Sequence, residues 1–188
     1  MAKVQVGRKI FLYPMPTTLV GANVGNKPNY ITIAHVGIMG VASVSISMRR
    51  THYTNFGIKE NSTFSVNIPS TRMVKETDYC GLVSGKNANK GILFQTFYGK
   101  LKTAPMVKEC YVNMECKLNQ TIEFPEHDIF IGEVVETYCD EHCLDEGVID
   151  MAKVDPILFA MGDKSYWRLG EQFAKAWDVG KALKPSKE

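Results

Sequence analysis

The stretch that decides the fold is Val41-Ala-Ser-Val-Ser-Ile-Ser-Met48, in which apolar residues alternate with serines. Alternation with a period of two is typical of a strand that buries one face. Three other short stretches rich in β-branched residues, 18–22, 30–34 and 64–68, are bounded by turn signals such as Gly25-Asn26 and Pro69-Ser70. The first third of the chain therefore predicts strands rather than helices.

Two longer strands are expected later, at 109–122 and 129–138, with Phe124-Pro-Glu-His-Asp128 as the hairpin loop between them. About six strands that do not alternate strictly with helices favour an antiparallel β-barrel over a dinucleotide-binding α/β sheet.

Helices are expected as short inserts in this barrel. We predict them at 54–60, at 71–79 behind a Ser70 cap, and at 171–183 near the C-terminus. The last helix would carry Phe173 and Trp177, more apolar surface than an exposed tail needs. It could pack on its own barrel or on a second subunit, and the sequence leaves both open.

Length and composition set limits on the function. We expect one domain over residues 1–188, with a frayed tail at 184–188. A net charge of +2 argues against a nucleic-acid partner, and no apolar run approaches the ~20 residues of a membrane span. No secretory signal is visible, so we expect a cytoplasmic protein.

The five cysteines are an odd number scattered along the chain, which fits reduced thiols better than a disulfide framework. Cys139-Asp-Glu-His142-Cys143 groups two thiols with an imidazole. Because a matching second half is missing, the segment falls short of the usual four-ligand metal pattern, and we predict no metal.

The segment from Arg49 to Lys90 gathers groups that hold phosphates. Arginine presents a fork of donors, hydroxyl side chains add short donors, and glycines let backbone N–H groups approach closely. Thr54 would also open a short helix, whose N-terminus attracts anions. If these pieces converge, the protein binds a phosphorylated cofactor.

The order of several motifs resembles the flavin reductase-like FMN-binding split-barrel family, especially its flavoredoxin branch. The motifs run from Asn29-Tyr-Ile-Thr32 through Ser45-Ile-Ser47-Met-Arg49, His52-Tyr-Thr54 and Phe64-Ser-Val-Asn-Ile-Pro69 to Cys80-Gly81, Ser84-Gly85 and Lys90. They continue through Ile131-Gly-Glu-Val134 and end at Tyr166-Trp-Arg-Leu-Gly170. The resemblance thus spans nearly the whole chain.

This resemblance implies a homodimer of Greek-key split barrels, with FMN near the dimer interface and the C-terminal helix at that interface. It implies that the phosphate is held by Arg49, Arg50, Thr54, Ser84 and Lys90. The flavin ring would lie along Asn29, Thr32, Ser45 and Ser47.

Each of these residues also has a structural interpretation. A surface arginine is usually solvated, Thr54 could be an ordinary helix cap, and Asn29 could serve the turn after Pro28. Cys80 is expected to line the cofactor or pack near a helix C-terminus rather than to act as a reactive thiolate.

Two departures from the family pattern concern the ring. His35 stands where many members have an aromatic residue, and Val41-Ala42 where many have a proline pair. Stacking on the ring and access for a pyridine nucleotide are therefore open.

Two functions follow from the resemblance. One is an NAD(P)H-dependent flavin reductase that passes a hydride from NADH or NADPH to FMN. The other is a flavoredoxin-type carrier that takes electrons from a protein partner such as a ferredoxin. A dinucleotide fingerprint of the Gly-x-Gly-x-x-Gly type is missing, but a nicotinamide lying in a shallow groove over the flavin would not need one.

Overall fold

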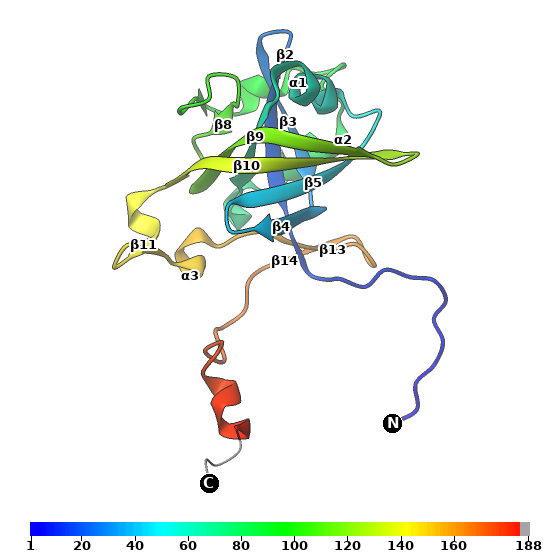
Figure 1. The fold of residues 1–188 in the computed structure, drawn as a ribbon, viewed down its shortest axis with the longest axis vertical. Helices are drawn as coiled ribbons and strands as arrows, with labels where there is room; N and C mark the ends of the chain where they lie inside the picture. Colours follow the sequence, from blue (N-terminus) through cyan, green and yellow to red (C-terminus); the bar gives the residue numbers. More distant parts are fainter. Residues whose placement is uncertain (185–188) are drawn as a thin grey trace.

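A seven-stranded antiparallel sheet forms the body of the protein in the computed structural model, which describes residues 1–184 (Figure 1). Its strands lie in the order β3-β2-β6-β9-β10-β5-β4, and the outer strands β3 and β4 pair with one neighbour each. Their bounds are β2 Thr18–Val24, β3 Lys27–Ile33, β4 Val36–Gly40, β5 Ser43–Arg49, β6 Thr63–Ile68, β9 Val112–Glu123 and β10 His127–Cys139. The mainly β, split-barrel prediction is confirmed.

Three smaller sheets and several short helices surround this barrel. The sheets pair β1 (Met15–Pro16) with β13 (Leu158–Ala160) and β14 (Ser165–Trp167), β7 (Thr96–Phe97) with β8 (Met106–Val107), and β11 (Leu144–Asp145) with β12 (Val148–Ile149). The α-helices are α1 Tyr53–Asn61, α2 Val74–Leu82 and α3 Met151–Val154, and the 3₁₀ turns are η1 Thr71–Met73, η2 Lys90–Leu93, η3 Glu141–Cys143 and η4 Val179–Leu183. Within residues 1–184, no helix has both the length and the apolar character needed to cross a membrane.

The alternation on β5 gives this strand two different faces. Val44, Ile46 and Met48 are buried in the barrel core, where they join side chains from β2, β3, β6, β9 and β10 and Ile58 of α1. Ser45 and Ser47 lie on the other face and are partly exposed. Burial of the apolar face therefore presents a polar serine row to the outside of the barrel.

The second predicted helix differs from expectation in its extent. The chain forms η1 first and then α2, which continues through Gly81 to Leu82. Ser70 precedes η1, but its side chain makes no capping hydrogen bond. Cys80 consequently lies inside the last turn of α2, and Gly81 packs against Thr32 of β3.

The predicted C-terminal helix over 171–183 is wrong. Residues 171–178 form no helix, and η4 is the only helical turn in this segment. Phe173 is 98% exposed and Trp177 is 95% exposed, so neither packs on the barrel. A short helix without a surface for its apolar face is marginal in water, which explains the result for a single chain. Packing on a second subunit stays a prediction.

Both terminal segments leave the barrel as separate arms (Figure 1). The first 14 residues form no strand or helix. The described chain ends at Lys184, so most of the predicted frayed tail lies outside the described residues.

Helix α1 is fastened to the barrel at both ends. Near its start, Asn55 Nδ2 donates to the Arg49 carbonyl oxygen at 3.0 Å. The buried carboxylate of Asp128 on β10 pairs with Lys59 at 2.8 Å and with Arg50 at 3.4 Å. At the other end, Asn61 Nδ2 donates to the Asn23 carbonyl oxygen at 3.0 Å. These contacts fix the direction in which the N-terminus of α1 points.

Gly57→Ala tests this attachment, because a Cβ at Gly57 would overlap the carbonyl oxygen of Asn23 on β2. Overpacking outweighs the gain of ~1 kcal/mol in helix propensity, and we expect a net loss of about 2 kcal/mol in the free energy of unfolding in urea. Gly40→Ala is the control, since a Cβ there meets no atom within 4 Å. Equal stability of the two variants would contradict the close approach of α1 to β2.

Candidate functional site

Two cavities meet at His52, the residue that precedes α1. One has a volume of about 250 Å³ and is bounded by the start of α1, the end of α2 and the loop that follows α2. The other has a volume of about 260 Å³ and lies over β3, β5 and the β13–β14 hairpin. Because His52 lines both, we treat them as two ends of one candidate site, which we call the Lys90 end and the Phe159 end.

The Lys90 end brings together Thr54, Cys80, Ser84 and Lys90, four residues predicted from the sequence. Thr54 is the second residue of α1, the His52 side chain makes no capping hydrogen bond, and the first turn carries no acidic residue. The partial positive charge at this helix end is therefore not offset by a side chain of α1 itself.

Lys90 is the most unusual group at this end, because the residue is only 2% exposed. Its Nζ donates to the carbonyl oxygens of Cys80 at 3.1 Å and Val83 at 3.0 Å, at the C-terminal end of α2. Within residues 1–184, no carboxylate pairs with it. Burial lowers the pKa of Lys90 from its usual value, as expected for an ammonium taken out of water without an anion.

Ser84 and Cys80 differ in their access to the cavity. Ser84 is exposed, and its Oγ accepts a hydrogen bond from the Lys86 backbone N–H at 3.3 Å. Cys80 is 1% exposed and packs with Leu19 and Tyr30 in a second apolar cluster. Burial raises the pKa of the Cys80 thiol to about 11, so this thiol stays protonated and uncharged at physiological pH.

Asn29 supports this end from behind. Its Nδ2 donates to Thr54 Oγ1 at 2.7 Å, which fixes the threonine rotamer. Gly85 packs so closely on Asn29 that a Cβ there would overlap the amide oxygen. Asn29 thus positions Thr54 and the loop after α2, and it lines an adjoining cavity that shares Tyr53, Gly85 and Lys90 with the Lys90 end.

The Phe159 end brings together Thr32, Ser47 and Arg49 of the predicted set. The Thr32 hydroxyl donates to the Thr77 carbonyl oxygen and thereby ties β3 to α2. Ser45 lies on the same face of β5 as Ser47 but outside the cavity, with its Oγ 3.5 Å from the Gly37 carbonyl oxygen. Apolar walls come from Ile33, Ala34, Phe159 and Met161.

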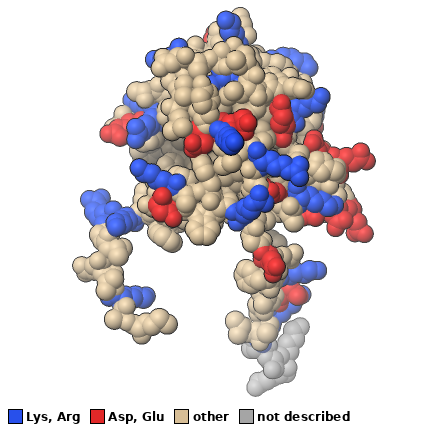
Figure 2. Space-filling model, turned by 180° about the vertical axis from the view of Figure 1, so that it is seen from behind, with Lys and Arg blue, Asp and Glu red and all other residues tan. Residues whose placement is uncertain are grey.

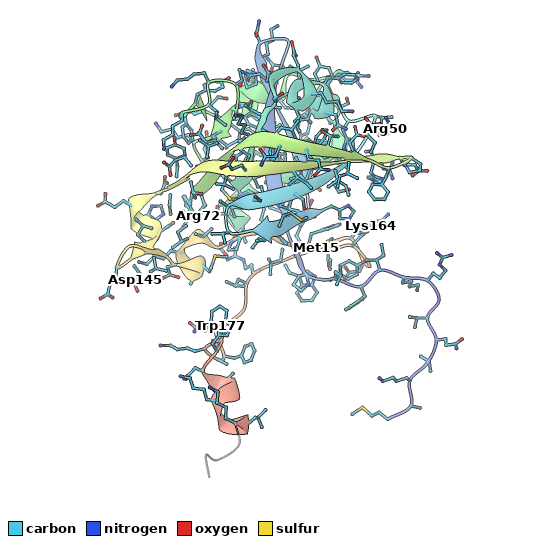
Figure 3. The ribbon with its side chains drawn as sticks, viewed as in Figure 1. Met15, Arg50, Arg72, Asp145, Lys164 and Trp177 are labelled. Atoms are coloured by element: carbon cyan, nitrogen blue, oxygen red, sulfur yellow. The ribbon has the colours of Figure 1, made fainter. Side chains whose placement is uncertain are left out.

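Arg50 lies in neither cavity. Its guanidinium pairs with Glu123 at 3.1 Å and with Asp128 at 3.4 Å, beside the β9–β10 hairpin. Figure 3 shows Arg50 at that edge of the barrel. The structure therefore assigns the two neighbouring arginines different positions: Arg49 lines the Phe159 end, and Arg50 helps to hold the buried carboxylate of Asp128.

Sequence reasoning missed His52 and His127 as members of the site. The antiparallel pairing of β5 with β10 sets His127 opposite Arg49, and both line the Phe159 end. His52 Nδ1 is buried without a hydrogen-bond partner in the described chain. Burial, followed by the positive charges of Arg49 and Lys90, lowers the pKa of His52, which keeps its ring neutral near pH 7.

Phe159 and Met161 were also missed, and they come from a hairpin far along the chain. His52 belongs to the His52-Tyr-Thr54 motif that was identified in the sequence, but no local pattern indicated that Phe159 and Met161 would line the site.

At the Cys139–Cys143 segment, His142 Nε2 lies 3.3 Å from Cys143 Sγ. Among residues 1–184, no three His, Cys, Asp or Glu side chains gather as a metal site.

Comparison with known proteins shows the family to which this fold belongs. The flavin reductase like domain model matches residues 10–167. A flavoredoxin from Methanosarcina acetivorans superposes with a TM-score of 0.95 at 45% identity, over 98% of this chain and 100% of that chain. The flavoredoxin of Desulfovibrio vulgaris (Miyazaki F) gives a TM-score of 0.89 at 36% identity, over 95% of this chain and 100% of that chain.

An uncharacterized protein from Archaeoglobus fulgidus is 30% identical over 129 residues, which are 66% of this chain and 72% of that protein. The domain match spans the barrel and every residue of the two-ended site, and the structural matches extend over nearly all of the chain. The chain belongs to the flavin reductase-like FMN-binding family, in its flavoredoxin branch.

Proposed function

We propose that this protein holds FMN in the two-ended site and works as an NAD(P)H-dependent flavin reductase. The observation that carries the proposal is Lys90, a buried cation with no carboxylate partner among residues 1–184, placed beside the open N-terminus of α1. A buried charge is costly unless it is paired, so this end of the site calls for an anion. The phosphate of FMN meets that requirement.

The residues at the Lys90 end have distinct tasks in this proposal. Lys90 supplies the fixed positive charge, and two of its three ammonium protons are already held by the Cys80 and Val83 carbonyls. The third is left for a phosphate oxygen. Thr54 and the first amides of α1 supply neutral donors, and Asn29 keeps the Thr54 hydroxyl in place.

The other end suits the flavin ring. Apolar contacts from Phe159 and Met161 match its dimethylbenzene side, while Thr32, Ser47 and strand backbone offer polar groups for its pyrimidine side. His52 lines both ends, so its ring would lie beside the ribityl chain of such a ligand. Bound FMN supplies the redox chemistry by accepting a hydride or single electrons, and the protein supplies position and polarity.

A second function has its own support. The two flavoredoxins at 45% and 36% identity resemble this chain over nearly its full length. We therefore propose, as an alternative, that the protein is an electron carrier that is reduced by a protein partner rather than by a pyridine nucleotide.

The choice of Lys90 as the phosphate partner is tested by Lys90→Met, which removes the charge but keeps the length of the side chain. We expect FMN affinity to fall by about 10- to 100-fold, the effect of ~1.4–3 kcal/mol from one charge-assisted hydrogen bond. Riboflavin lacks the phosphate, so its affinity should change less than about threefold. Flavin fluorescence quenching measures both affinities.

Lys108→Met is the matched control, because Lys108 is exposed and lines neither the Lys90 end nor the cavity that adjoins it. It should leave the affinities for FMN and riboflavin unchanged. Equal losses of FMN and riboflavin affinity in Lys90→Met would remove Lys90 from phosphate binding.

The electron donor is tested by mixing the FMN-loaded protein with NADH or NADPH without oxygen and following the visible flavin band in a stopped-flow instrument. If the protein is a reductase, its flavin band should bleach rapidly with at least one of the two nucleotides. Slow bleaching with both, together with rapid reduction by reduced ferredoxin, would reject the reductase and leave the carrier.

The lowered pKa of His52 predicts an acid sensitivity of the flavin-free protein. Below the ordinary value of 6.5, the unfolded state binds a proton at His52 more readily than the folded state does. Stability is thus lost as the pH falls through 6.5 towards the lower folded pKa. His52→Asn should show a smaller drop between pH 7.5 and 5.5 in urea unfolding. An unchanged drop would show that His52 is not held neutral.

A further inference from the structure

A separate cavity of about 510 Å³ lies outside the flavin site and shares no residue with it. Five segments of the chain build it: the start of η1, the residue before β9, η3, α3 with the residue after it, and the residue after β14. In Figure 3, Arg72 of this cavity and Arg50 lie on opposite sides of the barrel. The cavity therefore needs an explanation of its own.

The lining of this cavity, which we call the Arg72 cavity, is predominantly cationic. Arg72, Lys153 and Arg168 carry positive charge, and Asp155 is the only carboxylate among the lining residues. Arg168 Nη1 lies 3.3 Å from Asp155 Oδ2, and the same oxygen accepts from the Thr71 hydroxyl. One cation is thus neutralised, and two are not.

The two unneutralised cations keep donors available. Lys153 Nζ gives one hydrogen bond to the Leu144 carbonyl oxygen at 2.9 Å, which leaves two of its protons. Arg72 makes no side-chain hydrogen bond or ion pair with any residue in the described range 1–184, so its whole planar fork is free. Guanidinium forks match the geometry of phosphate and related oxyanions.

A serine hydroxyl also lines this cavity. The Ser70 residue is only 2% exposed, and it lines the cavity. Its side chain makes no capping hydrogen bond, although it precedes η1. Its hydroxyl is therefore free to donate to an oxyanion in the cavity.

Two rings that carry polar atoms form one wall of the cavity. The rings of Tyr111 and His142 meet edge to face with their centroids 4.7 Å apart. Both residues line the cavity. They add a phenol hydroxyl and an imidazole to a site that already combines two free cations with a serine hydroxyl.

We propose that the Arg72 cavity binds a small phosphate-like oxyanion. Arg72 and Lys153 supply the charge, Ser70 donates a hydroxyl hydrogen bond, and Asp155 stays with Arg168 and Thr71 so that its carboxylate does not oppose the ligand. This site is independent of FMN, because none of its residues lines the flavin site.

Inorganic phosphate is the probe that tests the proposal, titrated by calorimetry and by amide NMR at constant ionic strength set with sodium chloride. The protein is loaded with FMN, and the titration is repeated on flavin-free Lys90→Met, so that the Lys90 end gives no phosphate signal. We expect saturable binding with shifts at the amides of residues 70–72 and 152–155. Without saturation or without those shifts, the proposal fails.

Variants separate a built site from general charge attraction. Arg72→Gln should weaken phosphate binding by about tenfold or more, because a hydrogen bond to a charged group contributes ~1.5–3 kcal/mol. Ser70→Ala should weaken it several-fold, since it removes the hydroxyl donor. Lys75→Gln removes one charge from exposed α2 surface outside the cavity and should change nothing. An equal loss in Lys75→Gln, or no loss in Arg72→Gln, would overturn the proposal.

Discussion

The cost of burying the Lys90 ammonium is the constraint on which the rest of the site depends. The group is anchored to two carbonyl oxygens at the end of α2, so it cannot move out into water without breaking those bonds. Burial without an anion raises the free energy of the charged form, as the lowered pKa of Lys90 records. In our proposal, a bound phosphate offsets this cost, and the energy recovered contributes to the affinity for FMN.

The barrel positions the elements that line the two ends of the candidate site. The contacts of Asp128, Asn55 and Gly57 fix α1 on the barrel, so that its N-terminus faces the same cavity as Lys90. The pairing of β5 with β10 then sets Arg49 and His127 at the other end. Charge is interspersed elsewhere: on the face seen in Figure 2, Lys and Arg side chains stand among Asp and Glu rather than forming one basic surface.

Most of the strands could be predicted from the sequence, because β5 has an alternating pattern and the hairpins contain recognisable turn residues. The short edge strand β4 was missed, since Val36-Gly-Ile-Met-Gly40 is largely exposed and has no alternating pattern. The C-terminal helix was predicted from apolar content alone, which does not say whether a surface exists to cover it. Thr54, Cys80, Ser84 and Lys90 lie close together in sequence and were predicted to share a site, whereas Phe159 and His127 reach the candidate site only through long-range pairing.

The ionisation of the FMN phosphate tests the central claim most directly. A phosphate monoester free in water loses its second proton near pH 6, and its ³¹P resonance moves with that step. If the phosphate sits beside Lys90 and the start of α1, its dianion is stabilised, and the resonance of protein-bound FMN should stay constant from pH 8 to about pH 5. A bound resonance that titrates near pH 6, as in free FMN, would contradict the account.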